Sequence, residues 1–352
     1  MRMIIKIQDK LIGEDNPVFF IAEAGVNHNG SLDLGISLID AALDAGADAV
    51  KFQTFRADEL NIKAAPKSTY HIETTGDDSN QTWFELLRTQ EISEKMHIEL
   101  MDYCKNNNII FLSTPYGFES ADLLEKLNIP AYKIASTDTN NLPLIKYIAR
   151  KGKPMILSSA MCNMDEVEQA ILTVKNEGLR EVAMLQCTGN YPSKLSDSNL
   201  NVIKTYGDKL NCVIGYSDHT PDFINPVAAT AMGAKIYEKH FTIDKSLPGP
   251  DHRMSLDPEQ LKRTIDLVRK TEISLGRRHK QVLEDERENR KKLRKSLVTT
   301  KTIKQNTKID ASMVGIKRPG YGIEPKKLDE VLGKTSIRDI ESDSVIDYDD
   351  LR

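Results

Sequence analysis

The chain has 352 residues, of which 39% are hydrophobic and 28% are charged, a composition typical of a soluble globular protein. No apolar run approaches the roughly 18 residues of a membrane-spanning helix, and the first residues show no signal-peptide pattern, so we expect a cytoplasmic protein with no membrane partner. The formal net charge of −4 provides no basic field for nucleic acid, and the basic segment 287–296 lies beside acidic residues, as in a solvated linker.

From residue 17 onward, short apolar runs alternate with longer segments of helical period. Nearly continuous apolar runs are typical of parallel strands that are buried on both faces. We expect eight strands, at 18–24, 48–54, 109–115, 131–136, 154–160, 182–188, 212–218 and 235–241. Because parallel strands need crossover helices and eight strands close a sheet, this α/β pattern predicts a (β/α)8 TIM barrel. A doubly wound open sheet is the alternative, but no G-x-G-x-x-G motif follows the first run.

Helix signals lie between these runs. The segment 31–46 begins with Ser31, a suitable N-cap, and ends at Gly46, a common C-terminal stop. Apolar residues recur with helical spacing in 164–178, and 257–276 opens with Asp followed by Pro at the first helical position.

A long polar segment, 56–90, interrupts the alternation after the second run. We interpret it as a loop, and a loop of this length in a compact domain is usually functional or mobile. Because it follows a strand, it belongs to the catalytic face of the barrel.

The pattern changes after Gly276. We expect a barrel domain over residues 1–282, a polar, helical linker over 283–295, and a small, mostly β module over 296–352. Four widely spaced cysteines indicate neither a zinc knuckle nor a disulfide framework, and we expect them to be reduced thiols: Cys104, Cys162, Cys187 and Cys212.

Two histidines, His219 and His240, each follow one of the last two runs. Adjacent parallel strands would place both imidazoles at one mouth of the barrel, where reactive groups gather. Neutral imidazole is the commonest protein ligand of divalent metals, so the pair predicts a metal site. Structural, hydrogen-bonded histidines are the alternative.

Polar residues occupy the C-terminal end of each expected strand, among them Glu23, Lys51, Gln53, Lys133, Ser136, Ser158, Ser159, Thr188, Ser217, Asp218 and Glu238. Lysines inside a barrel strand are informative, because a buried ammonium group needs an anionic partner. Lys51 and Lys133 could therefore bind a phosphate, or a phosphate together with a carboxylate. Lysine also forms Schiff bases, so an aldolase is a competing interpretation, and ion-paired structural lysines are a third.

Several motifs, taken in order along the chain, resemble those of the sialic acid synthase family. They are NHNG (27–30), AVKFQT (49–54), STP (113–115), KIAS (133–136), GYSDHT (215–220), EKHFT (238–242) and GPDH (249–252). The tail, with KRPGYGI (317–323), resembles the C-terminal antifreeze-like, or SAF, domain of that family. The resemblance implies a metal-dependent enzyme that condenses phosphoenolpyruvate with an N-acetylated hexosamine to give a nine-carbon 2-keto acid.

The resemblance also implies roles for individual residues. His219 and His240 would hold a Mn²⁺ or Mg²⁺ ion, and Glu23 would transfer a proton or orient water. Phosphoenolpyruvate contacts are expected at Lys51, Lys133, Ser136, Ser158 and Ser217. Sugar contacts are expected at Glu23, Gln53, Asp138, Asn190, Tyr191 and Asp251. Arg318 is similar to an arginine that reaches the partner subunit's active site, which implies a domain-swapped homodimer with the small module as a lid.

The identity of the sugar stays open. Neuraminate-type enzymes tend to have Ser-Gly-Glu where this chain has Ser136, Thr137 and Asp138, and Gly189 stands where an asparagine is often found. N-acetylmannosamine and the diacetamido-trideoxyhexose precursors of legionaminate and pseudaminate are all candidates. The competing functions are a Schiff-base pyruvate aldolase using Lys51 or Lys133, and a carbohydrate-binding barrel without activity.

Overall fold

The computed structural model describes residues 3–77, 79 and 81–352. The chain divides into two compact units, Met1–Gly276 and Arg277–Arg352. The predicted barrel domain ran to residue 282, whereas the first compact unit ends at Gly276.

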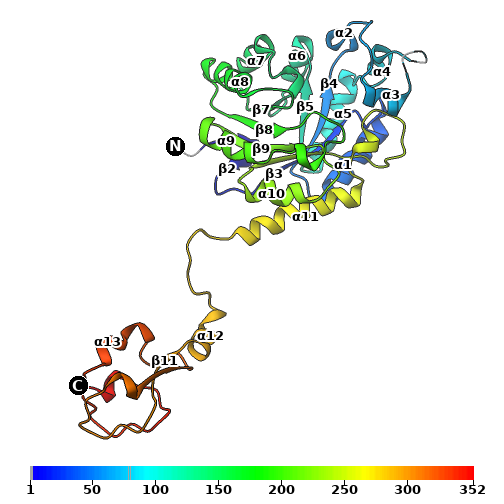
Figure 1. Cartoon of the computed structure of the whole chain (residues 1–352). Coiled ribbons are helices and arrows are strands. Elements are labelled where there is room, and N and C mark those ends of the chain that lie inside the picture. Colours follow the sequence, from blue (N-terminus) through cyan, green and yellow to red (C-terminus); the bar gives the residue numbers. More distant parts are fainter. Residues whose placement is uncertain (1–2, 78, 80) are drawn as a thin grey trace. The chain divides into compact units, whose positions relative to one another are not determined.

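In the described part of the first unit, eight parallel strands close into a barrel in the order β10-β3-β4-β5-β6-β7-β8-β9 (Figure 1). The strands are β3 (Phe19–Gly25), β4 (Ala49–Thr54), β5 (Ile110–Pro115), β6 (Tyr132–Ile134), β7 (Met155–Ser158), β8 (Val182–Cys187), β9 (Val213–Asp218) and β10 (Ile236–His240). Each lies within two residues of a predicted run, so the predicted TIM barrel is confirmed.

Helices surround this barrel (Figure 1). They are α1 (Leu32–Ala45), α5 (Glu94–Asn106), α6 (Phe118–Lys126), α7 (Leu142–Ala149), α8 (Met164–Asn176), α9 (Asn201–Lys209), α10 (Ile224–Ala231) and α11 (Pro258–Leu275). The predicted caps are present: the Ser31 hydroxyl accepts from the Leu34 amide, and Gly46 has a left-handed φ of 85°. Asp257 forms a capping box with Gln260 at the start of α11.

Alternation along the strands separates two apolar layers. In β3, Phe19 and Ile21 belong to the cluster inside the barrel, while Phe20 and Ala22 pack in the larger cluster between strands and helices. Successive strand residues point to opposite faces of a sheet, which is why neighbouring residues enter different clusters. Apolar side chains thus fill the lower barrel and leave its C-terminal mouth to polar ones.

The N-terminal end of the barrel is closed by a hairpin that the sequence analysis missed. Strands β1 (Ile4–Ile7) and β2 (Lys10–Gly13) pair antiparallel before the first predicted strand. Ile5, Ile7 and Ile12 are buried in the same cluster as the first residues of the barrel strands. Along β1 the exposed residues Ile4 and Lys6 alternate with the buried residues Ile5 and Ile7.

The prediction of a loop over 56–90 is wrong, because its described residues fold into short helices. These are α2 (Ala57–Leu60), α3 (Thr69–Thr75) and α4 (Trp83–Thr89). Ser68 and Thr82 cap α3 and α4 through their hydroxyls. The Glu59 carboxylate accepts from the backbone amides of Glu119 and Ser120, so it ties α2 to the start of α6.

In the second unit, β11 (Ser296–Thr299) and β12 (Val314–Lys317) pair antiparallel beside α12 (Glu286–Leu293) and α13 (Leu328–Val331). Helix α12 lies in the predicted linker, and the carbonyl of Lys291 accepts from the amide of Gly320 within this unit. The unit has its own small core: Leu297, Ile303, Ile309, Ile323, Val331, Ile340 and Ile346. Single turns of 3₁₀ helix occur at Ser136–Asp138, Leu195–Asp197, His252–Met254, Ala311–Met313, Pro325–Lys327 and Tyr348–Asp350.

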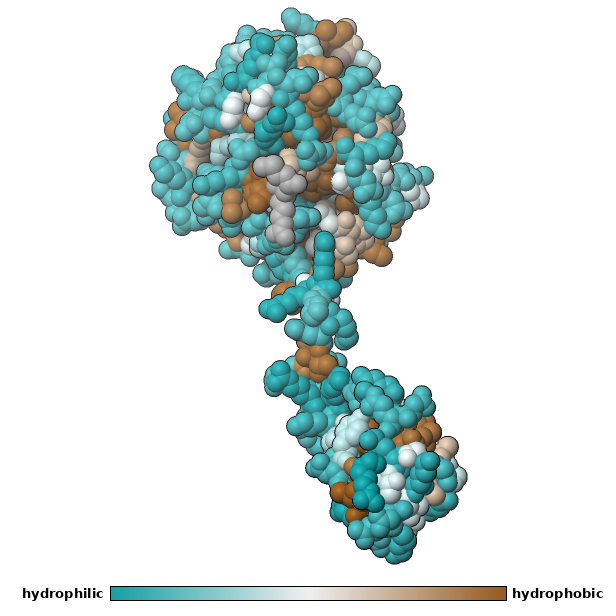
Figure 2. All heavy atoms as spheres, turned by 90° about the vertical axis from the view of Figure 1, so that its left-hand side faces the viewer, coloured by the Kyte–Doolittle hydropathy of each residue, from teal (hydrophilic) through white to brown (hydrophobic). Residues whose placement is uncertain are grey.

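The molecular surface is mainly hydrophilic on the face shown in Figure 2, with apolar side chains scattered across it. No helix in the described part of the chain has the length and apolar character needed to cross a membrane. All four cysteines are free thiols.

We predict that Ile7→Ala lowers the free energy of unfolding of the barrel unit by about 2–5 kcal/mol, because it empties a fully buried position in the β1–β2 hairpin. Ile4→Ala, on the same strand but 43% exposed, is the matched control and should change it by no more than about 0.5 kcal/mol. Urea unfolding followed by the fluorescence of Trp83, the single tryptophan, measures both. Equal changes in the free energy of unfolding would show that the hairpin does not close the barrel as described.

Candidate active site at the barrel mouth

The polar side chains at the C-terminal mouth of the barrel come from positions two residues apart on the same strands. Lys51 and Gln53 lie on β4, and Glu238 and His240 lie on β10. Residues i and i+2 of a strand share a face, so each pair points into the barrel together.

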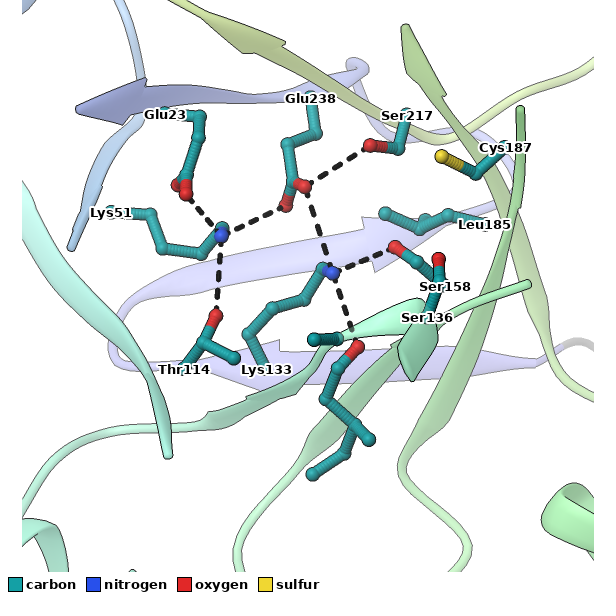
Figure 3. Close-up of polar contacts among 12 residues, drawn as sticks. Glu23, Lys51, Thr114, Lys133, Ser136, Ser158, Leu185, Cys187, Ser217 and Glu238 are labelled. Atoms are coloured by element: carbon teal, nitrogen blue, oxygen red, sulfur yellow. Dashed lines mark hydrogen bonds and ion pairs between the residues drawn. The ribbon is translucent and has the colours of Figure 1, made fainter. Parts of the chain in front are cut away.

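Lys51 is buried and holds two carboxylates near it (Figure 3). Its Nζ lies 2.6 Å from Glu23 Oε2 and 3.7 Å from Glu238 Oε2, and it donates to Thr114 Oγ1 at 3.2 Å. Gln53 donates to the other oxygen of Glu23 at 3.3 Å. Glu23 and Lys51 therefore form a close, buried ion pair.

Lys133, from β6, lies on the other side of Glu238 (Figure 3). Its Nζ is 3.6 Å from Glu238 Oε1 and donates to Ser158 Oγ at 2.6 Å and to the Ile134 carbonyl at 3.2 Å. Ser217 donates to Glu238 Oε1 at 3.1 Å. We call Glu23, Lys51, Lys133 and Glu238 the ion cluster.

Glu238 is the member of this cluster that the sequence analysis left out of its predicted site. The polar end of the strand was noted, but no role was assigned to this carboxylate. Its position two residues before His240 was the available signal, because it places both side chains on the inner face of β10.

The pKa values in the ion cluster shift in different directions, because burial and neighbouring charges act to different extents on each member. Burial alone would lower the pKa of Lys51, but Glu23 and Glu238 outweigh burial and raise it. Burial lowers the pKa of Lys133, which Glu238 only partly offsets. Burial raises the pKa of Glu23 to about 7, against the opposing effect of Lys51, so this carboxyl exchanges a proton near neutral pH.

The two predicted histidines are neighbours, with ring centroids 5.5 Å apart. The ring of Tyr191 lies 4.1 Å from that of His219 and 5.9 Å from that of His240. His219 Nδ1 is 2.6 Å from the Thr188 carbonyl, which fixes a proton on Nδ1, and Cys187 Sγ lies 4.0 Å from its Nε2. His240 Nδ1 is buried and has no hydrogen-bond partner among the described residues.

These imidazoles fit a divalent metal ion. Burial and the cationic neighbours hold the pKa of His240 well below its usual range, so its ring is neutral and can act as a ligand. Asp251 Oδ2 lies 3.8 Å from His240 Nδ1. Among the described residues there is no group of three or more His, Cys, Asp or Glu arranged for a metal, so water or substrate would supply the remaining ligands.

Cys187, which the sequence analysis predicted only to be a reduced thiol, also lies at the mouth. Its Sγ lies 3.7 Å from His219 Nδ1 (Figure 3 shows Cys187 beside Ser217). The register pairs Cys187 with Ser217 on the adjacent strand, which explains how it reaches the site.

The remaining predicted site residues have different contacts and exposure. Ser136 accepts from the Ala160 amide at 2.9 Å, and Asp138 is half-buried and accepts from Asn141 at 3.0 Å. Asn190 is exposed, and among the described residues it makes no polar contact with the ion cluster. Arg318 lies in the second unit, where it donates to the Leu293 carbonyl at 3.0 Å, so its predicted role in a partner's site stays a prediction.

Asp218, a polar residue at the end of β9, points outside the barrel. It lies 2.9 Å from Lys239 Nζ and accepts from the Tyr237 hydroxyl at 2.6 Å, beneath the helices. Ser217 and His219 on either side of it point inward, as the two-residue alternation requires. The acid of the GYSDHT motif therefore supports the strands and not the site.

Comparison with known proteins gives the same assignment over most of the chain. The NeuB family model matches residues 38–280, and the SAF domain model matches residues 294–352. The chain belongs to the NeuB family. N,N'-diacetyllegionaminic acid synthase of Campylobacter jejuni is 40% identical over 93% of this chain and 98% of its own.

Two solved structures are similar over most of this chain. The spore coat polysaccharide biosynthesis protein SpsE of Bacillus subtilis is 38% identical, covers 99% of both chains and has a TM-score of 0.67. An N-acetylneuraminic acid synthetase from Leptospira borgpetersenii is 32% identical, with a TM-score of 0.72 over 82% of this chain and 95% of its own. NeuB relatives of this chain are thus named for more than one nonulosonic acid.

We predict that Glu238→Gln lowers the free energy of unfolding by about 3–5 kcal/mol, because it leaves buried Lys133 without its carboxylate partner. Adding Lys133→Met should recover part of this loss, giving a double variant that departs from additivity by about 1 kcal/mol or more. Denaturant unfolding of the wild type, both single variants and the double variant measures the coupling. Simple additivity would show that the two side chains do not interact.

Proposed function

We propose that this protein condenses phosphoenolpyruvate with an N-acetylated hexosamine and water, giving a nonulosonic acid and phosphate. The candidate sugars are N-acetylmannosamine and a diacetamido-trideoxyhexose. The observation that carries the proposal is the pairing of two buried lysines with one shared carboxylate, Glu238, beside two adjacent histidines in a NeuB barrel.

Phosphoenolpyruvate binding is assigned to the side of the mouth that carries Lys51 and Lys133. Two ammonium groups inside a barrel offer a dianion stronger attraction than they would in water, because the site is shielded from solvent. The hydroxyls of Ser136, Ser158 and Ser217 lie on the side of Lys133 and Glu238 (Figure 3), where they would add hydrogen bonds to the bound anion.

His219 and His240 would hold a Mn²⁺ or Mg²⁺ ion: the rings are adjacent, and His240 has a lowered pKa and an unpartnered Nδ1. Such an ion supplies Lewis-acid polarisation of the aldehyde of the open-chain sugar. Tyr191 and Asp251 border the histidines on the side where the sugar would lie, and Gln53, Asp138 and Asn190 are its further proposed contacts.

In the reaction, C3 of phosphoenolpyruvate forms the new carbon–carbon bond to the aldehyde carbon, and the aldehyde oxygen takes up a proton. Water adds at C2 and gives up its protons, and the bridging oxygen leaves with phosphate, so a 2-keto acid remains. Glu23, with a pKa of about 7 and a hydrogen bond from Gln53, is placed to accept or return a proton in these steps.

A Schiff-base pyruvate aldolase is the second candidate. The lowered pKa of Lys133 favours it, because a neutral amine is required for attack on a carbonyl. The hydrogen bond from Lys133 to Ser158 and its closeness to Glu238 favour the anion-binding role instead.

We also propose a homodimer in which Arg318 of the small module enters the partner's site. A monomer in sedimentation at working enzyme concentrations would contradict this arrangement.

The proposed function is tested by incubating the purified protein with Mn²⁺, phosphoenolpyruvate and each of three sugars while phosphate release is measured. The sugars are N-acetylmannosamine, 2,4-diacetamido-trideoxy-mannose and the corresponding altrose. We expect phosphate release with at least one sugar and none without it. We expect His240→Ala to lower the rate by about 100-fold or more, as removal of a metal ligand's contribution would, while its circular dichroism matches the wild type.

No release with any of the three sugars would contradict the proposed function. Covalent trapping of [¹⁴C]pyruvate by borohydride, lost in Lys133→Met, would establish the aldolase in its place.

A further inference from the structure

Tyr70 reaches the barrel mouth from α3, in the segment that the sequence predicted as a loop. This segment follows β4, whose Lys51 and Gln53 belong to the site. The Lys67 ammonium donates to the Gly76 carbonyl, which joins the two ends of α3 and holds the short helix together. Tyr70 was not among the predicted site residues.

The ring of Tyr70 packs near that of Tyr191, which in turn contacts the two histidines. It lies 6.3 Å from the ring of Tyr191, which in turn lies 4.1 Å from that of His219. Tyr70 is therefore one ring further from the proposed metal position than Tyr191. A second contact, between His71 and Trp83 at 5.0 Å, packs α3 against α4 on the other side.

The hydroxyl of Tyr70 is buried and has no hydrogen-bond partner among the described residues. Buried hydroxyls in native proteins nearly always have a partner, and an unsatisfied one needs an explanation. Burial, with Asp251 nearby, raises the pKa of Tyr70, so the phenol keeps its proton and can donate it. A ligand that accepts this hydrogen bond would satisfy the hydroxyl.

Asp251 supplies the complementary half of a recognition site. Its carboxylate is close enough to raise the pKa of Tyr70, and its Oδ2 lies 3.8 Å from His240 Nδ1. A phenol that donates beside a carboxylate that accepts suits a group with both a C=O and an N–H. An acetamido group has both, and aromatic rings also suit its methyl.

We propose that Tyr70 is a specificity-determining residue, and that its hydroxyl donates a hydrogen bond to the acetamido group of the sugar that lies remote from the aldehyde. The inference rests on the proposed function and names the substituent that the site reads. The remote group is chosen because the aldehyde belongs at the histidines and Tyr70 stands one ring beyond Tyr191. A 2,4-diacetamido sugar has such a group, whereas N-acetylmannosamine has a hydroxyl there.

The test compares Tyr70→Phe with the wild type, using the full chain, Mn²⁺, phosphoenolpyruvate and the two sugars 2,4-diacetamido-trideoxy-mannose and N-acetylmannosamine. We expect the ratio of kcat/KM for the diacetamido sugar to that for N-acetylmannosamine to fall about fivefold to tenfold, the effect of one neutral hydrogen bond. Tyr103→Phe is the matched control, because it removes a phenol that donates to Asp40 away from the mouth, and its ratio should equal that of the wild type. An unchanged ratio in Tyr70→Phe would overturn the proposal.

A readout without turnover separates this proposal from the proposed function. In the sugar-free protein, Tyr70→Phe should have the Tm of the wild type or a higher one, because it removes an unsatisfied buried hydroxyl. A Tm lower by more than about 3 °C would show that the hydroxyl has a structural partner, and would overturn the proposal. If the wild type releases phosphate with none of the three sugars, the proposed function fails. The rise in Tm caused by the diacetamido sugar still tests Tyr70: it should be smaller in Tyr70→Phe, and an equal rise would overturn the proposal.

Discussion

The ion cluster at the barrel mouth is the constraint on which the rest of the site depends. Two lysines and two glutamates are almost fully removed from water, and none of these charges is tolerable there without an opposite charge close by. Glu238 forms ion pairs with both ammonium groups, and Glu23 forms one with Lys51 at 2.6 Å. The arrangement is close to neutral, and it gives an arriving anion two cations whose positions are already fixed.

The apolar layers below the mouth keep this cluster in place. The interior of the barrel is filled by aliphatic side chains, and the hairpin closes its N-terminal end with Ile5, Ile7 and Ile12. Closely packed interiors allow little side-chain movement, so the lysines cannot withdraw downward and must point to the mouth. On the outer face of the same strands, the pair of Asp218 and Lys239 satisfies charges that have no part in the site.

The barrel was predictable because its strands are continuous apolar runs and its helices carry ordinary caps such as Ser31 and Asp257. The positions of Lys51 and His240 followed from the rule that strand ends form the mouth. Glu238 was missed although the same alternation determines it, whereas the contact between Cys187 and His219 depends on the register of two strands and cannot be read from either one.

The hairpin and the short helices could not be predicted from hydrophobic periodicity, because each element is too short. The hairpin strands are four residues each, too short for their alternation to stand out from a terminal segment. Helices α2, α3 and α4 are four to seven residues long and depend on caps and on contacts such as that of Glu59 with α6. Short helices are marginal without tertiary packing, so propensity does not reveal them. Tyr70 was hidden for the same reason.

The most direct measurement of the central claim is the affinity of phosphoenolpyruvate itself, determined by isothermal titration calorimetry on the wild type and on Lys133→Met without sugar. Lys133→Met removes one cation, and Glu238 keeps Lys51 as a neighbour at 3.7 Å. The account predicts one site per chain in the wild type and an affinity about 10- to 100-fold weaker in the variant, as expected for the loss of charged hydrogen bonds. Equal affinity in the two proteins would contradict it.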